Sequence, residues 1–273
     1  MRNNLYYWLV FLLIISSCDR AQTLNNKMDR SDGNIVVGYV AGYRDFDFSS
    51  IQAEKLTHIN YAFANIIDGA VQFDGLVIDN VTLRKEDVLS MQYLKKKNPD
   101  LKILISIGGW TWSTEFSDVA LHEESRQKFA RSCVDFLVDY KLDGIDLDWE
   151  YPGQIGGGNT FRPEDKENFT LLLKAVRDTL DDQSKKDGLT KENGYLLTIA
   201  TGANQTYIDN TDLGEAHQYL DFINIMCYDF RGGYDHLTGH HANLFAGEMP
   251  ESYSESGEAA VNRHVAAGVP IQK

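Results

Sequence analysis

The chain has 273 residues, a length typical of one large domain, and 43% of them are hydrophobic, which is enough to fill a substantial core. Acidic residues outnumber basic ones by 40 to 26, and the formal net charge is −14. This charge repels the phosphate backbone of nucleic acids and anionic lipid, so we expect no nucleic-acid partner. A neutral substrate such as a polysaccharide remains open.

The N-terminus has the pattern of an export signal. Arg2 supplies a positive charge, and the apolar run that follows, Leu5–Ile15, is too short to span a bilayer comfortably. Small residues then lead into Cys18, an order that resembles the lipobox of bacterial lipoproteins. We predict a lipoprotein signal over residues 1–18, lipidation of Cys18, and a membrane-anchored protein on the periplasmic or cell-surface side. The alternative is an ordinary secretory signal that happens to contain a cysteine.

The segment after the signal is polar. Residues 19–34 lack apolar periodicity, which is typical of a tether between membrane and domain. Only Cys133 and Cys227 follow, and one pair of cysteines in so long a chain is no disulfide framework. Cys133 lies on an apolar stripe at helical spacing, and Cys227 lies in a strand-like run. Neither has cysteine or histidine neighbours at metal-ligand spacing, so both are predicted to be structural.

From residue 35 onward, short runs rich in β-branched residues alternate with longer helical patterns. Strands are predicted at Ile35–Val40, His58–Ala64, Lys102–Ile107, Gly144–Trp149, Tyr195–Ala200 and Phe222–Tyr228. Helices are predicted at Lys85–Lys97, Glu123–Lys141 and Arg162–Ser184, with shorter ones near Asp209–His217 and Ser256–Ala267. This alternation indicates a parallel sheet with crossover helices.

Open sheets and closed barrels share this alternation, and the fourth predicted strand separates them. In an open sheet covered on both faces, central strands are nearly continuous apolar runs. The strand Gly144–Trp149 instead alternates acidic and apolar residues, which favours a barrel with a polar interior. The predicted fold is therefore an α/β barrel of the (β/α)8 TIM type over residues 35–273.

The acidic residues of this strand carry the chemistry. Because side chains alternate along a strand, Asp146, Asp148 and Glu150 project to one face. Two residues of strand rise about 6.6 Å, so these carboxylates couple as like charges. They cannot all ionise comfortably, and at least one pKa must rise. The intervening residues project the other way, toward helices; they are Ile145, Leu147 and Trp149.

A carboxyl with a raised pKa at the C-terminal end of a barrel strand is a candidate general acid. Pro152 ends the strand, which places Glu150 at the mouth of the barrel. A solvated edge strand is the plain alternative, but the flanking residues are strongly apolar. A magnesium or calcium site is the second alternative, but the calcium-loop pattern is absent. We expect no metal and no cofactor.

The motif Asp143-x-x-Asp146-x-Asp148-x-Glu150, which continues into Tyr151-Pro152, resembles the signature of family-18 glycoside hydrolases, the chitinases and their relatives. Three further segments resemble motifs of this family in the right order; they are Ser106–Trp110 on the third strand, Met226–Phe230 on the sixth, and Gly239–Leu244 in the loop after it. Tyr39 and Phe63 stand where the family has aromatic residues on strands one and two.

The resemblance implies retaining hydrolysis in which the substrate's own acetamide attacks the anomeric carbon. Glu150 would protonate the leaving oxygen and later activate water. Asp148 would orient the acetamide and stabilise the oxazolinium intermediate, while Asp146 would share a proton with Asp148. Tyr228 would donate its hydroxyl to the acetamide oxygen, and Asp229 would contact the same sugar. Further substrate-binding residues implied by the resemblance are Met226, Trp110, Tyr39, Phe63 and Gly109.

Other polar and aromatic residues near these motifs have weaker assignments. Asp143 lies at the start of its strand, where a structural capping role is expected. Trp110 and Trp112 follow the third strand and either stack on sugar rings or pack internally. The pair His240-His241 suggests a metal, but it lies in a loop without further ligands.

The sequence departs from the family pattern at two points. Gly202 stands where chitinases usually have proline, which affects loop stiffness. Residues 266–273 have the pattern of an approach to a seventh strand, and six strands are predicted where the family's barrel has eight. We therefore expect a barrel truncated after about six β/α units, in a fragment of a longer product whose remainder supplies the tryptophan of the cleavage subsite.

The leading prediction is a chitinase-type glycoside hydrolase of β-1,4-linked N-acetylglucosamine polymers, with chitin or its oligosaccharides as partner. An endo-β-N-acetylglucosaminidase that trims glycoprotein glycans uses the same acids, and a peptidoglycan or spore-wall hydrolase is a third option. The segment Trp149–Pro152 favours the chitinase. A noncatalytic sugar-binding protein of the same fold is the alternative from another class, but such lectins usually lack the acid found here at Glu150.

Overall fold

The protein is described by a computed structural model that covers residues 33–44, 46–73, 77–78, 81–82, 85–247 and 255–273. The predicted signal, the lipidation site Cys18 and almost all of the predicted tether lie outside the described residues. In the part that is described, no helix is both long and apolar enough to cross a membrane.

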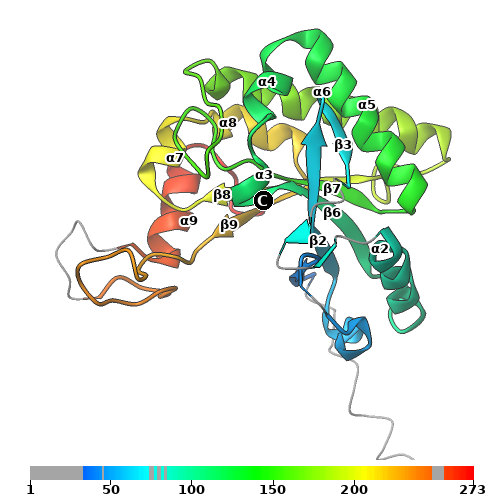
Figure 1. Ribbon diagram of the computed structural model, residues 1–273, viewed down its shortest axis with the longest axis horizontal. Coiled ribbons are helices and arrows are strands. Elements are labelled where there is room, and N and C mark those ends of the chain that lie inside the picture. Colours follow the sequence, from blue (N-terminus) through cyan, green and yellow to red (C-terminus); the bar gives the residue numbers. More distant parts are fainter. Residues whose placement is uncertain (1–32, 45, 74–76, 79–80, 83–84, 248–254) are drawn as a thin grey trace, which may run out of the picture.

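The centre of the molecule is a parallel sheet whose strands follow one another in chain order (Figure 1). Its parallel strands are β1 (Val37–Ala41), β2 (His58–Ile67), β6 (Lys102–Gly108), β7 (Gly144–Asp148), β8 (Leu196–Gly202) and β9 (Phe222–Met226). An unbroken sequential order is the arrangement of a (β/α) barrel, whereas the order of a doubly wound sheet reverses at a switch point. Within the described residues, β1 and β9 each have one sheet neighbour, so the six predicted strands form an open part of a barrel.

One short strand extends this sheet, and two others form a pair of their own. Strand β3 (Ala70–Gln72) pairs antiparallel with the end of β2. Strands β4 (Val77–Ile78) and β5 (Val81–Thr82) form a separate antiparallel pair. The predicted strands Gly144–Trp149 and Phe222–Tyr228 were too long, because the chain leaves the ladder after Asp148 and after Met226.

The long helices lie where the sequence predicts them. They are α2 (Lys85–Met91), which continues into the 3₁₀ helix η4 (Gln92–Lys96), α5 (Glu123–Tyr140), α6 (Asp165–Lys186) and α9 (Gly257–Ala266). The short helix predicted near Asp209–His217 is confirmed in part, because α8 (Leu213–Ala216) lies within these bounds while α7 (Gln205–Asp209) precedes it and the 3₁₀ turn η5 (His217–Tyr219) follows it. The Asn204 side chain caps α7 by accepting a hydrogen bond from the Tyr207 N–H at 2.9 Å, which fixes the earlier start.

Four short helices were not predicted. They are α3 (Gly109–Trp112), α4 (Phe116–Leu121), η2 (Phe48–Ser50) and η3 (Ala53–Lys55). Helix α3 follows β6 directly and begins at the glycine pair, where Gly108 and Gly109 both have positive φ. A positive φ is a conformation that favours glycine, so the glycines permit the abrupt turn from strand to helix.

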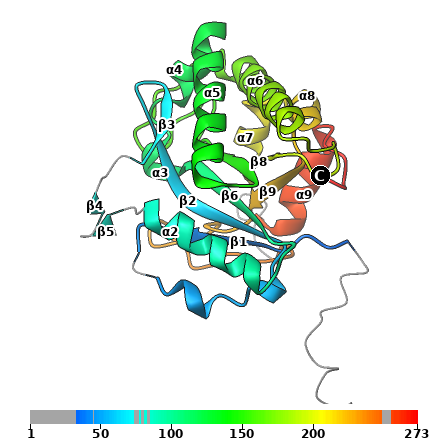
Figure 2. The same cartoon turned by 90° about the vertical axis from the view of Figure 1, so that its right-hand side faces the viewer.

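The core lies between the sheet and the helices α5 and α6, which lie side by side outside it in both views (Figures 1 and 2). Ile145 and Leu147 of β7 are fully buried there. Trp149 stacks on Phe116 with ring centroids 5.3 Å apart and meets Phe169 of α6 edge to face at 5.5 Å. The predicted outward apolar face of β7 is therefore confirmed. Cys133 of α5 is also buried in this core, as predicted.

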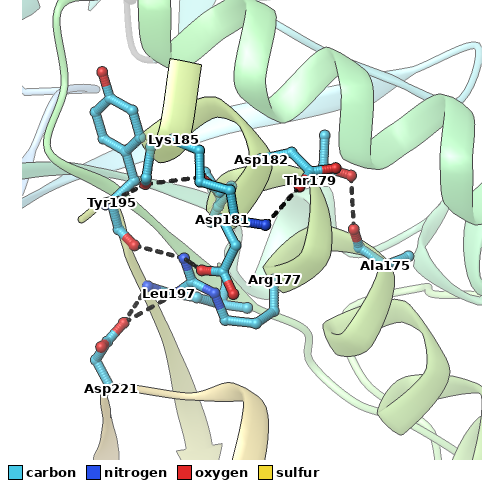
Figure 3. Close-up of polar contacts among 11 residues, drawn as sticks. Ala175, Arg177, Thr179, Asp181, Asp182, Lys185, Tyr195, Leu197 and Asp221 are labelled. Carbon is cyan, nitrogen blue, oxygen red and sulfur yellow. Dashed lines mark hydrogen bonds and ion pairs between the residues drawn. The ribbon is translucent and has the colours of Figure 1, made fainter. Parts of the chain in front are cut away.

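At the N-terminal ends of the strands, a polar network fixes α6 against β8 and β9 (Figure 3). Arg177 of α6 pairs with Asp181 at 2.6 Å and with Asp221 at 3.3 Å, and it donates to the Tyr195 carbonyl at 2.8 Å. Asp221 also accepts the Leu197 N–H at 2.7 Å. These contacts hold the strand starts in register, which in turn positions the strand ends that carry the site.

Candidate active site

Three carboxyl groups line up along β7 and the residues that follow it, as the alternation predicts. Asp146, Asp148 and Glu150 are 0%, 4% and 8% exposed, so burial decreases toward the mouth of the barrel. Asp148 and Glu150 both line a cavity of about 980 Å³ at the C-terminal ends of the strands. An acid at the rim of such a cavity, with a second carboxyl behind it, can exchange a proton with a bound molecule.

Asp146, the deepest of the three, is held by four hydrogen-bond donors from four strands. Tyr39 Oη and Ser106 Oγ donate to Oδ2 at 2.8 and 2.7 Å. Thr198 Oγ1 and Asn224 Nδ2 donate to Oδ1 at 2.6 and 3.3 Å. A carboxylate offers about four lone-pair sites, so this one is fully occupied. Burial raises the pKa of Asp146, and these hydrogen bonds oppose that rise.

Asp148 has the opposite environment. Its Oδ1 atom is buried and has no hydrogen-bond partner among the described residues. Burial raises the pKa of Asp148 well above its ordinary value, and the charges of Glu150 and Asp146 raise it further. A buried acceptor without a partner is costly unless something binds to it. A ligand that donates a hydrogen bond to Asp148 Oδ1 would therefore remove this cost.

Glu150 is held at the rim by its backbone. Its N–H donates to Ser113 Oγ at 2.8 Å, and that hydroxyl lies 2.9 Å from the Gly109 carbonyl oxygen and 3.2 Å from that of Asp148. Burial raises the pKa of the Glu150 carboxyl, the charge of Asp229 adds to the rise, and a hydrogen bond from Tyr151 opposes it. The predicted rise in pKa is thus present, but its largest cause is burial rather than the neighbouring carboxylates.

The cavity is lined by aromatic side chains as well as acids. Trp110 is 56% exposed and meets Tyr151 edge to face, with centroids 6.4 Å apart. Phe63 also lines the cavity, and a Cβ atom at Gly109 would lie 2.8 Å from its ring. Gly109 is thus placed where only a glycine allows the chain to pass this ring. Exposed aromatic faces beside carboxylates are suited to binding the apolar faces and hydroxyls of a sugar.

A smaller cavity of about 250 Å³ adjoins the first, and Asp148, Met226 and Tyr228 line both. Tyr39 lines the smaller one while its hydroxyl donates to Asp146. Burial raises the pKa of Tyr228 to about 12, and the charges of Asp148 and Glu150 contribute to it. Tyr228 therefore keeps its proton at neutral pH and can act as a hydrogen-bond donor beside Asp148.

Asp229 lies at the cavity wall, just beyond the end of β9. Its backbone has a left-handed conformation with φ of 56°, and its carbonyl oxygen accepts the Tyr234 hydroxyl at 2.5 Å. The carboxylate lies 3.4 Å from His241 Nε2 and is 69% exposed. Asp229 thus lines the cavity with a largely exposed carboxylate.

Several residues singled out by the sequence lie away from the cavity. Trp112 is 5% exposed and packs in the core, so the second of its two alternatives, internal packing, is the one that the structure shows. Asp143 accepts Lys95 Nζ at 2.6 Å and the Ile103 N–H at 2.7 Å, which is a structural role. Across the described residues, no group of three or more potential ligands is arranged to hold a metal ion.

Sequence reasoning missed the residues that support the acids. Ser106 stands inside a recognised motif, and Thr198 stands one position from the apolar Leu197 on β8, so strand alternation could have placed both in the barrel interior. Ser113 lies in no regular pattern, and no sequence signal indicates that it holds Glu150. Gly202 lies close to the Tyr207 ring, and a Cβ atom there would approach the ring to 3.0 Å.

The fold and the site together define a (β/α)-barrel protein with an acid–base carboxyl site at the end of its fourth parallel strand. Residues 35–273 match the family described as "Glycosyl hydrolases family 18". The chain belongs to this family.

Curated relatives share this part of the chain. Chitinase A1 of Niallia circulans is 37% identical over 90% of this chain and 42% of its own length. Chitinase 1 of Aphanocladium album is 34% identical over 84% of this chain and 55% of its own length. The chain thus spans about half the length of the curated relatives it matches.

Solved structures give the same result for the fold. A family-18 N-acetylglucosaminidase from Paenibacillus barengoltzii superposes with a TM-score of 0.76 at 43% identity, over 86% of this chain and 65% of that one. Chitinase ChiA74 from Bacillus thuringiensis also has a TM-score of 0.76, at 35% identity, over 86% of this chain and 46% of that one. The six-stranded arrangement described above is therefore that of the family's barrel.

Proposed function

We propose that the protein hydrolyses β-1,4-linked N-acetylglucosamine polymers, such as chitin or chito-oligosaccharides, by a retaining and substrate-assisted mechanism. The observation that carries this proposal is the pair formed by Glu150 and Asp148. The first is an acid of raised pKa at the rim of the cavity, and the second is a buried carboxyl whose Oδ1 lacks a partner among the described residues. The relatives named chitinases support the substrate class.

In this mechanism the acetamide of the substrate forms the bond to the anomeric carbon while the bond to the leaving oxygen breaks. Glu150 gives its proton to the leaving oxygen, and it later takes a proton from the water that opens the oxazolinium intermediate. Asp148 accepts the acetamide N–H on its unpartnered Oδ1 and stabilises the positive charge that develops. Burial strengthens both interactions because the local dielectric is low.

Tyr228 and Met226, which line both cavities, and Asp229, which lines the larger one, complete the acetamide site. Tyr228 donates its hydroxyl to the acetamide oxygen, and Met226 and Asp229 contact the same sugar. Asp146 shares a proton with Asp148 only after one of its four present donors gives way. Two of these donors, the Tyr39 hydroxyl and the Asn224 amide, come from residues that also line the smaller cavity, so a bound sugar can displace one of them.

Aromatic residues bind the rest of the sugar chain in this proposal. Trp110 presents an exposed ring in the larger cavity, Phe63 lines both cavities and Tyr39 lines the smaller one, and Gly109 lets the chain pass close to Phe63. Stacking of this kind contributes affinity but no chemistry.

Release of single N-acetylglucosamine units is a second candidate. It is favoured by the 43% identity to the N-acetylglucosaminidase from Paenibacillus barengoltzii. Trimming of glycoprotein glycans uses the same acids and remains an alternative. A noncatalytic sugar-binding role is less favoured, because the acid at Glu150 is present and its pKa is raised.

We also propose that the protein is exported and anchored by a lipid on Cys18. The support is the order of positive charge, apolar run, small residues and cysteine at the N-terminus. Incorporation of labelled fatty acid by the natural chain, and its loss in Cys18→Ser, would test this. Labelling that persists in Cys18→Ser would contradict it.

Glu150→Gln tests the proposed reaction. Chitopentaose hydrolysis should fall by about 10²–10⁴-fold, the usual contribution of a general acid. The loss should be smaller on an aryl glycoside, because an acidic phenol leaves without needing the proton. Glu167→Gln on the exposed face of α6 is the matched control and should retain full activity. An equal loss on both substrates would contradict the assignment of Glu150 as proton donor.

A further inference from the structure

One edge of the large cavity is polar and takes no part in the chemistry proposed above. Glu255, which lies just before α9, lines this cavity together with Glu150 and Asn204. Glu255 therefore shares a single cavity with the proton donor while belonging to a different part of the barrel. Neither the acid motif nor the acetamide site accounts for a carboxylate at this edge.

The Glu255 carboxylate is held in a fixed orientation by Arg263 of α9. Arg263 Nη1 donates to Oε2 at 2.5 Å, and Nη2 donates to Oε1 at 3.1 Å. The main chain is held too, because the Glu255 carbonyl accepts Asn243 Nδ2 at 2.8 Å. A side chain fixed by a two-pronged ion pair loses little conformational entropy when a ligand binds to it.

The same arginine links this carboxylate to the loop after β8. Arg263 Nη1 also donates to the Ala203 carbonyl at 3.0 Å, directly before Asn204. The Asn204 Oδ1 atom accepts the α7 cap bond from the Tyr207 N–H, which leaves its amide nitrogen as a donor that the cap does not use. A fixed acceptor and a donor thus lie along one edge of the cavity.

The carboxylate keeps unused acceptor capacity. It has about four lone-pair sites, and the arginine occupies one on each oxygen. Its charge is already balanced by Arg263, so a neutral hydroxyl or amide N–H is a better match than a second cation. The Glu255 side chain is 32% exposed and lines the cavity, so its free lone pairs are accessible to a ligand.

We propose that Glu255, held by Arg263, is a specificity-determining residue of a further sugar subsite. It accepts a hydrogen bond from a hydroxyl or acetamide N–H of a sugar other than the one placed over Asp148, and Asn204 donates to the same sugar. This inference rests on the proposed function, because it assigns the site to another unit of the same oligosaccharide.

The test measures binding without turnover, in the full chain carrying Glu150→Gln. Calorimetry with N-acetylated oligomers from two to six sugars should show affinity rising with length. Adding Glu255→Gln should lower the affinity for the hexamer about tenfold, the scale of one hydrogen bond to a charged group, and lower that for the disaccharide much less. Glu258→Gln, an exposed position on the same helix with the same change of charge, is the control and should bind as the parent does.

Three outcomes would overturn the proposal. If Glu255→Gln binds every length as the parent does, the subsite is wrong while the proposed function stands. If it weakens every length equally and lowers the melting temperature, the ion pair is structural. If a fully deacetylated hexamer binds more tightly than the acetylated one and loses that gain in Glu255→Gln, the residue selects a cation. An absence of binding by the Glu150→Gln parent would count against the proposed function itself.

Discussion

Acidic residues at the two ends of the parallel strands differ in their hydrogen-bond and ion-pair partners. On β7, Asp143 at the N-terminal end pairs with Lys95 and accepts a backbone N–H, whereas Asp148 at the C-terminal end has a buried oxygen with no partner in the part of the chain that is described. On β9, Asp221 before the strand contacts Arg177 and the Leu197 N–H, whereas Asp229 after it faces the cavity.

This difference shows where the molecule uses acids for stability and where it holds them ready for a ligand. A paired carboxylate at the strand starts stabilises the fold because its partner is already in place. An unpartnered, buried carboxyl at the strand ends opposes folding, and under the proposed function the donor that the substrate brings would offset this cost. The division agrees with the general rule for barrels, in which the C-terminal face carries function and the N-terminal face carries stability.

The largest effect is expected from Asp148→Asn, which removes the charge of the unpartnered carboxyl at the C-terminal end of β7. Loss of the charge that stabilises the intermediate should reduce hydrolysis about a hundredfold. Stability should change in the other direction. The folded pKa of Asp148 is raised, so its favourable contribution is present below the unfolded pKa of about 4 and is lost as pH rises through the folded pKa.

Asparagine does not titrate and escapes that loss. Asp148→Asn should therefore gain about 1–3 kcal/mol over the natural protein at pH 8, and much less at pH 4. Denaturant unfolding at the two pH values measures the gain. A gain that does not depend on pH, or a loss of stability at pH 8, would contradict the view that this carboxyl is held at a cost.

Thr198→Val tests Asp146, whose carboxylate accepts four hydrogen bonds in the barrel interior. The change keeps the shape of the side chain and removes the 2.6 Å donor to Asp146, so the folded state should lose about 1–3 kcal/mol. Thr179→Val is the control, because that hydroxyl only donates to the Ala175 carbonyl within α6. Chemical denaturation measures the free energy of unfolding of both variants. If both lose the same amount, the hydrogen bond to Asp146 stabilises the fold no more than one within a helix.

Trp110→Ala asks whether the exposed aromatic wall belongs to the functional end. Loss of one stacking ring is worth about 0.5–1.5 kcal/mol, so KM for chitopentaose should rise between about twofold and tenfold with kcat little changed. Phe161→Ala, another exposed aromatic outside the cavity lining, is the control. A fall in kcat with KM unchanged would place Trp110 in the chemical step instead.

Asp221→Asn should have the smallest effect, and on stability alone. The carboxylate is 39% exposed, so solvent screening limits its ion pair with Arg177, and the expected loss is about 0.5–1 kcal/mol. Activity per folded molecule should not change, because the residue lies at the opposite end of the strands from the cavity. A change in kcat for the folded variant would contradict the separation of the two ends.

The alternation of β7 was sufficient to predict the three carboxyls and the apolar face behind them. The pair Trp110 and Trp112 was not resolved by the sequence, because both follow the same strand. They lie two positions apart on the short helix α3, so they point to different sides, one to the cavity and one to the core. Strand and loop patterns carry no signal for such a turn.

The cause of the raised pKa values was also misjudged from sequence. Like charges two residues apart are visible in the sequence, whereas the burial that dominates depends on how helices cover the strand ends. Ser113 was missed for a related reason, since it bonds to the Glu150 N–H across 37 positions of the chain. Glu255 belongs to the same class, because the cavity that it shares with Glu150 is formed by segments far apart in the sequence.

The most direct measurement is the titration of Asp148 and Glu150 by NMR of carboxyl carbons in the natural protein, with Asp148→Asn and Glu150→Gln used to assign the signals. The account predicts that both carboxyls titrate above the ordinary range near 4, Asp148 well above it, and that a bound chito-oligosaccharide shifts the Asp148 signal. Titration of both groups at ordinary values, in a folded protein that still hydrolyses chitopentaose, would contradict it.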